Sequence, residues 1–194
     1  GEFLVGDMSN FERKASFDPM PLPGGEAAIK APWRTGLSYL YHHYGNILPD
    51  IPMLRGKDTS SIIQMIDKDI NSPLTSSCGR LFDAVAAISG GRQEIRYEAQ
   101  AAIEFMQAAN NQLGYDHSIF DILKPEDRYL ISIPHIMTEL VSRIHSGYSL
   151  MSLSQWFHHS LIKSFLKVAE RLRDHDGVNK IVLSGGVFQN KLLF

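Results

Sequence analysis

The chain has 194 residues, 44% of them apolar and 21% charged, which is the balance of an ordinary globular domain with enough apolar side chains for a core. Its net charge of −2 and isoelectric point near 6.5 argue against a broad basic surface, so we expect no general nucleic-acid binding. Charged residues and prolines interrupt every apolar run well before the ~18 residues of a membrane helix, so no membrane span is expected.

The first half of the chain predicts a strand pair followed by helices. Residues 2–5 and 11–17 alternate or run apolar, as in two antiparallel strands, and the prolines and glycines of 19–25 predict a loop. Pro32 suits the first turn of a helix that Gly45 ends. Asp58 is expected to cap a helix reaching about Ile70, and residues 79–89 predict a buried helix that is apolar on nearly all sides.

The second half predicts further helices around a second strand pair. Residues 98–112, 134–145 and 149–174 have helical patterns, and 118–133 predict two short strands around a Lys-Pro-Glu-Asp turn. Residues 180–183 predict a short buried strand, and the glycines after Ser184 a turn into a final helix. The whole pattern predicts an α/β fold in which helices dominate.

The sharpest local motif is Ile-Val-Leu-Ser-Gly-Gly-Val-Phe-Gln-Asn at residues 181–190. Without a Cβ, Gly185 and Gly186 let the backbone approach a ligand, and a following helix would direct its free N–H groups to the same place. Asn190 would then lie in the first helical turn, within reach of a sugar or a base. A tight turn without any ligand explains the same glycines equally well.

A second motif places Asp83 inside an apolar helix that Gly79 and several Ser and Thr residues open. A carboxylate buried there costs several kcal/mol unless it is paired or liganded. Arg80 lies three residues earlier and could form an ion pair, which local physics favours. The functional alternative is a carboxylate that accepts hydrogen bonds from a nucleotide ribose.

The histidines and the cysteine are weaker candidates. His42-His43 and His158-His159 are adjacent pairs that diverge by ~100° on a helix, and no two histidines have the i, i+4 spacing of a zinc helix. We interpret them as surface or core-edge residues. Cys78, the single cysteine, excludes an intrachain disulfide and is interpreted as a small buried hydrophobe rather than a nucleophile. A lone cysteine also agrees with a cytoplasmic location.

Taken together, these segments resemble the HypF family of carbamoyltransferases. The resemblance rests on five segments in order: residues 1–4, 21–25 with 32–34, 72–87, 97–104 and 183–190. It implies the helix-rich portion of a two-lobed, actin-like ATPase (ASKHA) fold, truncated at both ends. We expect residues 1–20 to be the strand pair of the first lobe, 21–180 a helical region, and 181–194 the start of a nucleotide-binding turn and helix.

The resemblance also implies a nucleotide site. Asp83 matches the ribose-binding aspartate of the relatives, and Gly185, Gly186 and Asn190 match the turn that contacts adenosine. Gly79 and Gln100 are expected to contact the nucleotide as well; Gln100 stands where the related threonylcarbamoyl branch has a glycine, which points to the HypF branch. Ala99 departs from the pattern, because HypF proteins are expected to have glycine there, and its methyl group would narrow the cleft or fill slack.

For the intact protein, the resemblance implies use of carbamoyl phosphate and ATP, with Mg²⁺, to carbamoylate the C-terminal cysteine of the partner HypE for the cyanide ligands of [NiFe]-hydrogenase. Zinc or iron would be bound by residues outside this chain, no catalytic residue is assigned within it, and the chain alone is expected to be inactive. The alternatives are a carbamoyltransferase for a small hydroxyl substrate and a non-catalytic interaction module.

Overall fold

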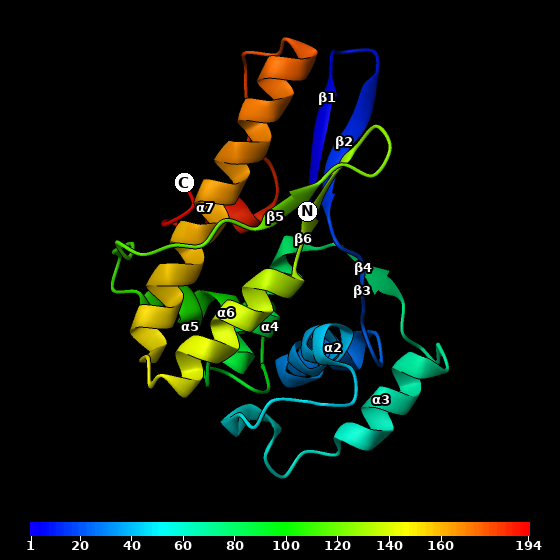
Figure 1. Cartoon of the computed structure of the whole chain (residues 1–194), viewed down its shortest axis with the longest axis vertical. Helices are drawn as coiled ribbons and strands as arrows, with labels where there is room; N and C mark the ends of the chain where they lie inside the picture. The colour runs from blue at the N-terminus through cyan, green and yellow to red at the C-terminus, as the bar shows by residue number, and fades with distance from the viewer.

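The computed structural model describes residues 1–194 as a small sheet at one end and a group of helices at the other, with the long helix α7 running beside both (Figure 1). This mixed α/β architecture, in which helices dominate, confirms the predicted fold class. The helices are α1 (Glu26–Lys30), α2 (Pro32–Tyr44), α3 (Thr59–Asp67), α4 (Cys78–Ile88), α5 (Gln100–Ala108), α6 (Pro134–His145) and α7 (Leu150–Asp176), with short 3₁₀ turns η1 (Pro52–Leu54) and η2 (Gly186–Gln189).

Four strands form the main sheet in the order β1 (Glu2–Gly6), β2 (Phe11–Phe17), β6 (Tyr129–Ser132) and β5 (Asp121–Leu123). The predicted antiparallel pair β1–β2 is confirmed, and so are the two short strands predicted within residues 118–133, which pair antiparallel as β5 and β6. The two pairs join because β6 runs parallel to β2, with Phe17 opposite Ile131. A second, two-stranded sheet pairs β3 (Met20–Pro21), in the segment expected to be a loop, with β4 (Leu74–Thr75), where no strand was predicted.

Several residues predicted to begin or end a helix do so in the structure. Pro32 is the first residue of α2, and Gly45, at a φ of 57°, follows its last residue. The Asp58 carboxylate accepts a hydrogen bond from the Ser61 N–H at the start of α3. Two helices are shorter than predicted. Helix α3 stops at Asp67 rather than near Ile70, and α5 spans only Gln100–Ala108 rather than residues 98–112.

The core is built on α4, whose residues are almost all buried and which packs against α2 and α5. Phe82 of α4 meets Phe157 of α7 edge-on, with ring centroids 5.2 Å apart. Trp156 of the same helix is also buried in the core. None of the helices, α7 included, combines the length and the hydropathy needed to cross a membrane.

Three buried serines on α7 connect this helix to its neighbours. The Ser160 hydroxyl accepts a hydrogen bond from the Ser118 N–H at 3.0 Å, and the Ser164 hydroxyl accepts from the Phe120 N–H at 2.9 Å. The Ser154 hydroxyl donates to the carbonyl of Phe105 in α5. The first two bonds satisfy backbone groups of the segment that leads into β5, and so they attach the sheet to α7.

The prediction of a buried strand at residues 180–183 was wrong. Ile181, Val182 and Leu183 are 70%, 89% and 48% exposed and form no strand. An apolar run becomes a strand only when another strand lies beside it to pair with its N–H and C=O groups, and none does here. The predicted final helix is likewise replaced by the single 3₁₀ turn η2.

We predict that Ser164→Ala lowers the free energy of unfolding by about 1–3 kcal/mol, because the buried Phe120 N–H loses its acceptor. Urea denaturation of the purified chain measures this. Ser142→Ala is the control: Ser142 is an exposed α6 residue whose hydroxyl makes no hydrogen bond, so its replacement should leave stability nearly unchanged. Equal effects of the two substitutions would contradict the role of the serine bonds.

Candidate functional site

A pocket of about 390 Å³ opens between α4, the start of α5 and the C-terminal segment. Four of the six residues that sequence reasoning selected line it: Gly79, Asp83, Gly186 and Asn190. They come from segments far apart in the sequence, so the fold brings them together. The C-terminal segment (red in Figure 1) reaches this place by folding back along α7.

Asp83 is the buried charge of the pocket. Its side chain is 1% exposed, and its Oδ2 lies 2.9 Å from the Nη1 of Arg80, so the predicted ion pair is present. The two groups are close but poorly aligned, because neither carboxylate oxygen of Asp83 has a hydrogen-bond partner and the Arg80 Nη1 has none either. The ion pair therefore offsets only part of the cost of burying the Asp83 charge and leaves its hydrogen-bonding capacity unsatisfied.

Burial raises the pKa of Asp83 to about 6; the Arg80 guanidinium opposes this shift and the Glu98 carboxylate adds to it. Glu98 is exposed and also lines the pocket, so two carboxylates face the same space. No lysine lines it, and the only guanidinium there is Arg80, already beside Asp83. Such a pocket accepts hydrogen bonds from neutral hydroxyls and repels a phosphate.

The rest of the pocket wall is mostly apolar. Phe82, Ala102, Ile103, Met106 and Val187 supply it. An apolar wall beside a few hydrogen-bonding groups is the usual make-up of a small-molecule site. The pocket is therefore suited to a ligand with one flat or apolar part and one hydroxyl-bearing part.

The two glycines of the C-terminal turn have different reasons to be glycine. Gly185 has a φ of 98°, which side-chain-bearing residues rarely adopt, so the turn itself requires it. Gly186 has no positive φ, and a Cβ there would meet no atom within 4 Å. The backbone therefore explains the glycine at 185 but not the one at 186. Gly186 lines the pocket, whereas Gly185 does not.

Asn190 reaches the pocket with a fixed amide. Its Oδ1 accepts a hydrogen bond from the Leu192 N–H at 3.0 Å, which turns its Nδ2 towards the Nε2 of His158, 2.9 Å away. His158 is completely buried, which corrects its interpretation as a surface or core-edge residue. Its spacing of three residues from Leu161 and seven from Phe165, both apolar positions of the predicted helix, is the signal that marked the core face.

Gln100 does not line the pocket. Its side chain is turned along α5, where Oε1 accepts from the Arg96 N–H and Nε2 donates to the Glu104 carboxylate, both at 2.8 Å. The amide is thus engaged at both ends within the chain. Its contact with a nucleotide, implied by the resemblance, stays a prediction.

Ala99 lies in the pocket wall with a φ of 61°, in the left-handed region. It precedes α5 and supplies no side-chain cap to that helix. A left-handed alanine costs roughly 1–2 kcal/mol relative to the right-handed conformation, and glycine avoids this cost. The structure thus explains physically why glycine is the expected residue there.

Cys78 is buried at the start of α4. Burial raises the pKa of its thiol to about 12, so Cys78 behaves as a small hydrophobic residue.

The chain contains no group of three or more His, Cys, Asp or Glu side chains that could hold a metal ion.

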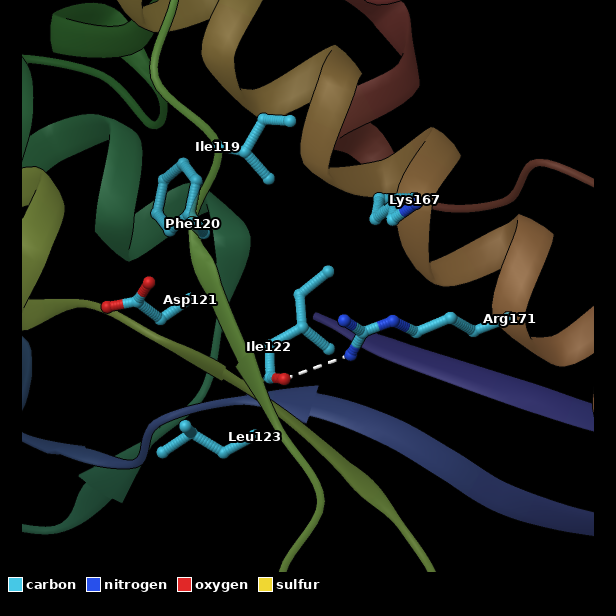
Figure 2. A pocket seen from close by; sticks show the side chains of 7 residues that line it. All are labelled: Ile119, Phe120, Asp121, Ile122, Leu123, Lys167 and Arg171. Atoms are coloured by element: carbon cyan, nitrogen blue, oxygen red, sulfur yellow. Dashed lines mark hydrogen bonds between the residues drawn. The ribbon is translucent and has the colours of Figure 1, made fainter.

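A second hollow, of about 350 Å³, lies beside the sheet edge (Figure 2). It is lined by residues 119–123 with Lys167 and Arg171, and the Arg171 guanidinium donates to the Ile122 carbonyl at 2.9 Å. This bond occupies an acceptor on the outer edge of β5. The hollow contains none of the predicted site residues, and we assign it no ligand.

Comparison with known proteins gives one consistent family. The family described as "Carbamoyltransferase, Kae1-like Domain, second subdomain" matches residues 1–194. The curated Carbamoyltransferase HypF of Rhodobacter capsulatus is 32% identical over 196 residues, and that of Rhizobium leguminosarum bv. viciae 33% over 198; each comparison covers all of this chain. Because these alignments cover 25% and 24% of the two relatives, the chain spans about a quarter of their length.

Solved structures agree. A crystal structure of full-length HypF in the phosphate- and nucleotide-bound form superposes with a TM-score of 0.87 at 35% identity, covering 99% of this chain and 30% of that one. The crystal structure of T. kodakarensis HypF gives a TM-score of 0.80 at 25% identity, covering 100% of this chain and 26% of that one. The fold described above is therefore one that occurs within much longer proteins.

We predict that Ala99→Gly stabilises the chain by about 0.5–1 kcal/mol, since it relieves the left-handed strain at the cost of a more flexible unfolded chain. Ala102→Gly is the matched control, because Ala102 lines the same pocket from within α5 at ordinary helical angles. It should destabilise by about 1 kcal/mol. Thermal unfolding of both variants measures the difference; a loss at both positions would show that Ala99 is unstrained.

We further predict that the buried charge of Asp83 makes stability fall as pH rises. The pKa of Asp83 is raised to about 6 in the folded chain. Between about pH 4 and 6, Asp83 is therefore protonated in a larger fraction of folded than of unfolded molecules. Above that window the charge costs on the order of 2–3 kcal/mol. Asp83→Asn should remove this dependence, so the stability difference between variant and wild type should grow from about pH 4.5 to 7. A difference that stays constant over this range would contradict the raised pKa.

Proposed function

Because the chain belongs to the HypF carbamoyltransferase family, we propose that it supplies the adenosine-binding part of a carbamoyltransferase. The observation that carries the proposal is the pocket lined by Gly79, Asp83, Gly186 and Asn190. These are four of the residues that the family resemblance selects. Within the chain, residues 181–194 would act as the nucleotide-binding turn against the helical region of residues 21–180.

The chemistry of the pocket supports adenosine rather than phosphate as the part bound here. The unsatisfied carboxylate of Asp83 would accept hydrogen bonds from the two ribose hydroxyls. The apolar wall would take the adenine ring, and the second N–H of the Asn190 amide remains free for the ligand. The carboxylates of Asp83 and Glu98 would direct the phosphates of ATP away from this wall.

A solved relative, full-length HypF, is in a phosphate- and nucleotide-bound form, which supports a nucleotide as a ligand of the longer protein. For the intact protein we propose that ATP, with Mg²⁺, carbamoyl phosphate and water give a carbamoyl-adenylate, phosphate and pyrophosphate. The carbamoyl group would then pass to the C-terminal cysteine thiolate of HypE, with AMP as the leaving group, for the cyanide ligands of [NiFe]-hydrogenase. Zinc or iron would be bound outside this chain, whose own side chains form no metal-binding group.

The contribution of this chain is positioning. Holding the adenosine half fixes the reactive end of the adenylate relative to groups elsewhere in the protein, which lowers the entropic part of the barrier. Asp83, Gly186 and Asn190 would therefore change nucleotide affinity first and turnover as a consequence. A cytoplasmic location would suit this role and the single reduced cysteine.

We predict that Gly186→Ala weakens binding of a non-hydrolysable ATP analogue more than ~10-fold, or ~1.4 kcal/mol, while stability is unchanged. The added methyl meets no protein atom, so a loss of affinity must come from contact with the ligand. Asn190→Ala should give a similar loss because it removes the amide donor. Isothermal titration calorimetry on the complete protein that carries this chain measures both.

Gly45→Ala is the control for this experiment. Gly45 ends α2 with a positive φ and lies outside the pocket, so its replacement should lower the melting temperature and leave affinity per folded molecule intact. If Gly186→Ala and Asn190→Ala both bind like the wild type, the nucleotide assignment of the pocket fails. A wild-type protein that binds no ATP analogue would favour the non-catalytic interaction module instead.

A further inference from the structure

We propose that the buried His158 is a positioning residue for the nucleotide pocket, which holds the Asn190 amide in place through its Nε2. This inference rests on the function proposed above for the pocket. His158 does not line the pocket itself. It acts from α7, behind the pocket wall, and its contacts reach two of the segments that form that wall.

The ring of His158 is fixed by its surroundings. Its Nδ1 lies 2.7 Å from the Ser154 carbonyl, one helical turn earlier on α7. Phe105 stacks on the ring with centroids 5.8 Å apart, and Phe82 lies at 5.2 Å. A side chain that packs against two aromatic rings and hydrogen-bonds its own helix has little freedom to rotate.

The hydrogen bonds determine which nitrogen carries the proton. A carbonyl only accepts, so Nδ1 must donate to Ser154. Burial lowers the pKa of His158 to about 4, which leaves the ring neutral and Nε2 with a free lone pair. The Asn190 Nδ2, 2.9 Å away, is the donor that this lone pair meets.

The Asn190 side reaches the same assignment independently. Its Oδ1 accepts from the Leu192 N–H, so the amide cannot be turned over without losing that bond. Its Nδ2 therefore gives one hydrogen to His158 and keeps the other. The bond to Ser154 fixes the orientation of the His158 ring, and the bond from Leu192 fixes that of the Asn190 amide. The two orientations place a donor on Asn190 opposite an acceptor on His158.

His158 also contacts the opposite wall of the pocket. Phe82, against which its ring packs, lines the pocket next to the acidic residue Asp83 on α4. One imidazole therefore bridges the helix that carries the proposed ribose acceptor and the turn that carries Asn190. This matters because residues 181–183, which precede the turn, are largely exposed and give the turn little packing of its own.

A purely structural histidine, buried and satisfied, would show the same burial. The two roles differ in what a substitution changes. His158→Phe keeps an aromatic ring in the packing but removes both ring nitrogens, the Nε2 acceptor among them, whereas His158→Gln retains an acceptor near the position of Nε2. A positioning role requires the two variants to differ in nucleotide affinity, and a packing role requires them to differ only in stability.

The test measures affinity for a non-hydrolysable ATP analogue by calorimetry, per folded molecule, in the complete protein that carries this chain. The proteins compared are the wild type, His158→Phe, His158→Gln, Asn190→Ala and the double variant His158→Phe/Asn190→Ala. We expect an about 10-fold loss for His158→Phe and recovery to within about 3-fold of the wild type for His158→Gln. The double variant should lose no more than Asn190→Ala alone, because the two residues act as one unit.

The possible results separate this inference from the proposed function. If Asn190→Ala loses affinity but His158→Phe binds like the wild type, or if their losses multiply in the double variant, the positioning role of His158 is overturned and the pocket assignment stands. If the wild type itself binds no ATP analogue, the proposed function fails and this inference fails with it. Recovery by His158→Gln together with a non-additive double variant supports both.

Discussion

The carboxylate of Asp83, buried in the apolar helix α4, is the physical constraint around which the site is arranged. An isolated buried charge is expensive, and the nearby Arg80 guanidinium compensates only in part, because it makes no aligned hydrogen bond. The raised pKa of Asp83 is the measure of that incomplete compensation. A ligand with hydroxyl groups would supply the missing donors, so the cost in stability and the proposed binding role have the same origin.

Helix α7 contacts both the segment that leads into the sheet and the residues around the pocket. Its serine hydroxyls at 160 and 164 accept from the backbone leading into β5, so they attach the sheet to one side of the helix. Closer to the start of the same helix, His158 reaches Phe82 and Asn190 on the pocket side. One helix thus connects the sheet of the chain to the pocket, with polar contacts buried on its core face.

Local side-chain chemistry accounts for most of the correct predictions. Pro32, Gly45 and Asp58 act on the backbone within one helical turn of themselves, so their effects are readable without the rest of the fold. The apolar periodicity of α4 and α7 is equally local, and so is the likeness of residues 72–87 and 183–190 to the HypF family. The ion pair of Arg80 and Asp83, three residues apart, also belongs to this group.

Other features of the molecule depend on contacts between residues that are distant in the sequence, and these only the tertiary structure decided. Residues 180–183 are apolar enough for a strand but have no neighbouring strand, and β6 becomes part of the main sheet only because β2 lies beside it. His158 was judged as half of a histidine pair, whereas its role follows from Phe82, Phe105 and Asn190 around it. By itself the sequence determined most of the helices, the signals at Pro32, Gly45 and Asp58 that begin or end them, and the candidate residues, because those signals act over a few residues. The pairing of strands and the geometry of the pocket required the folded chain, because their energies come from contacts that the sequence does not place side by side.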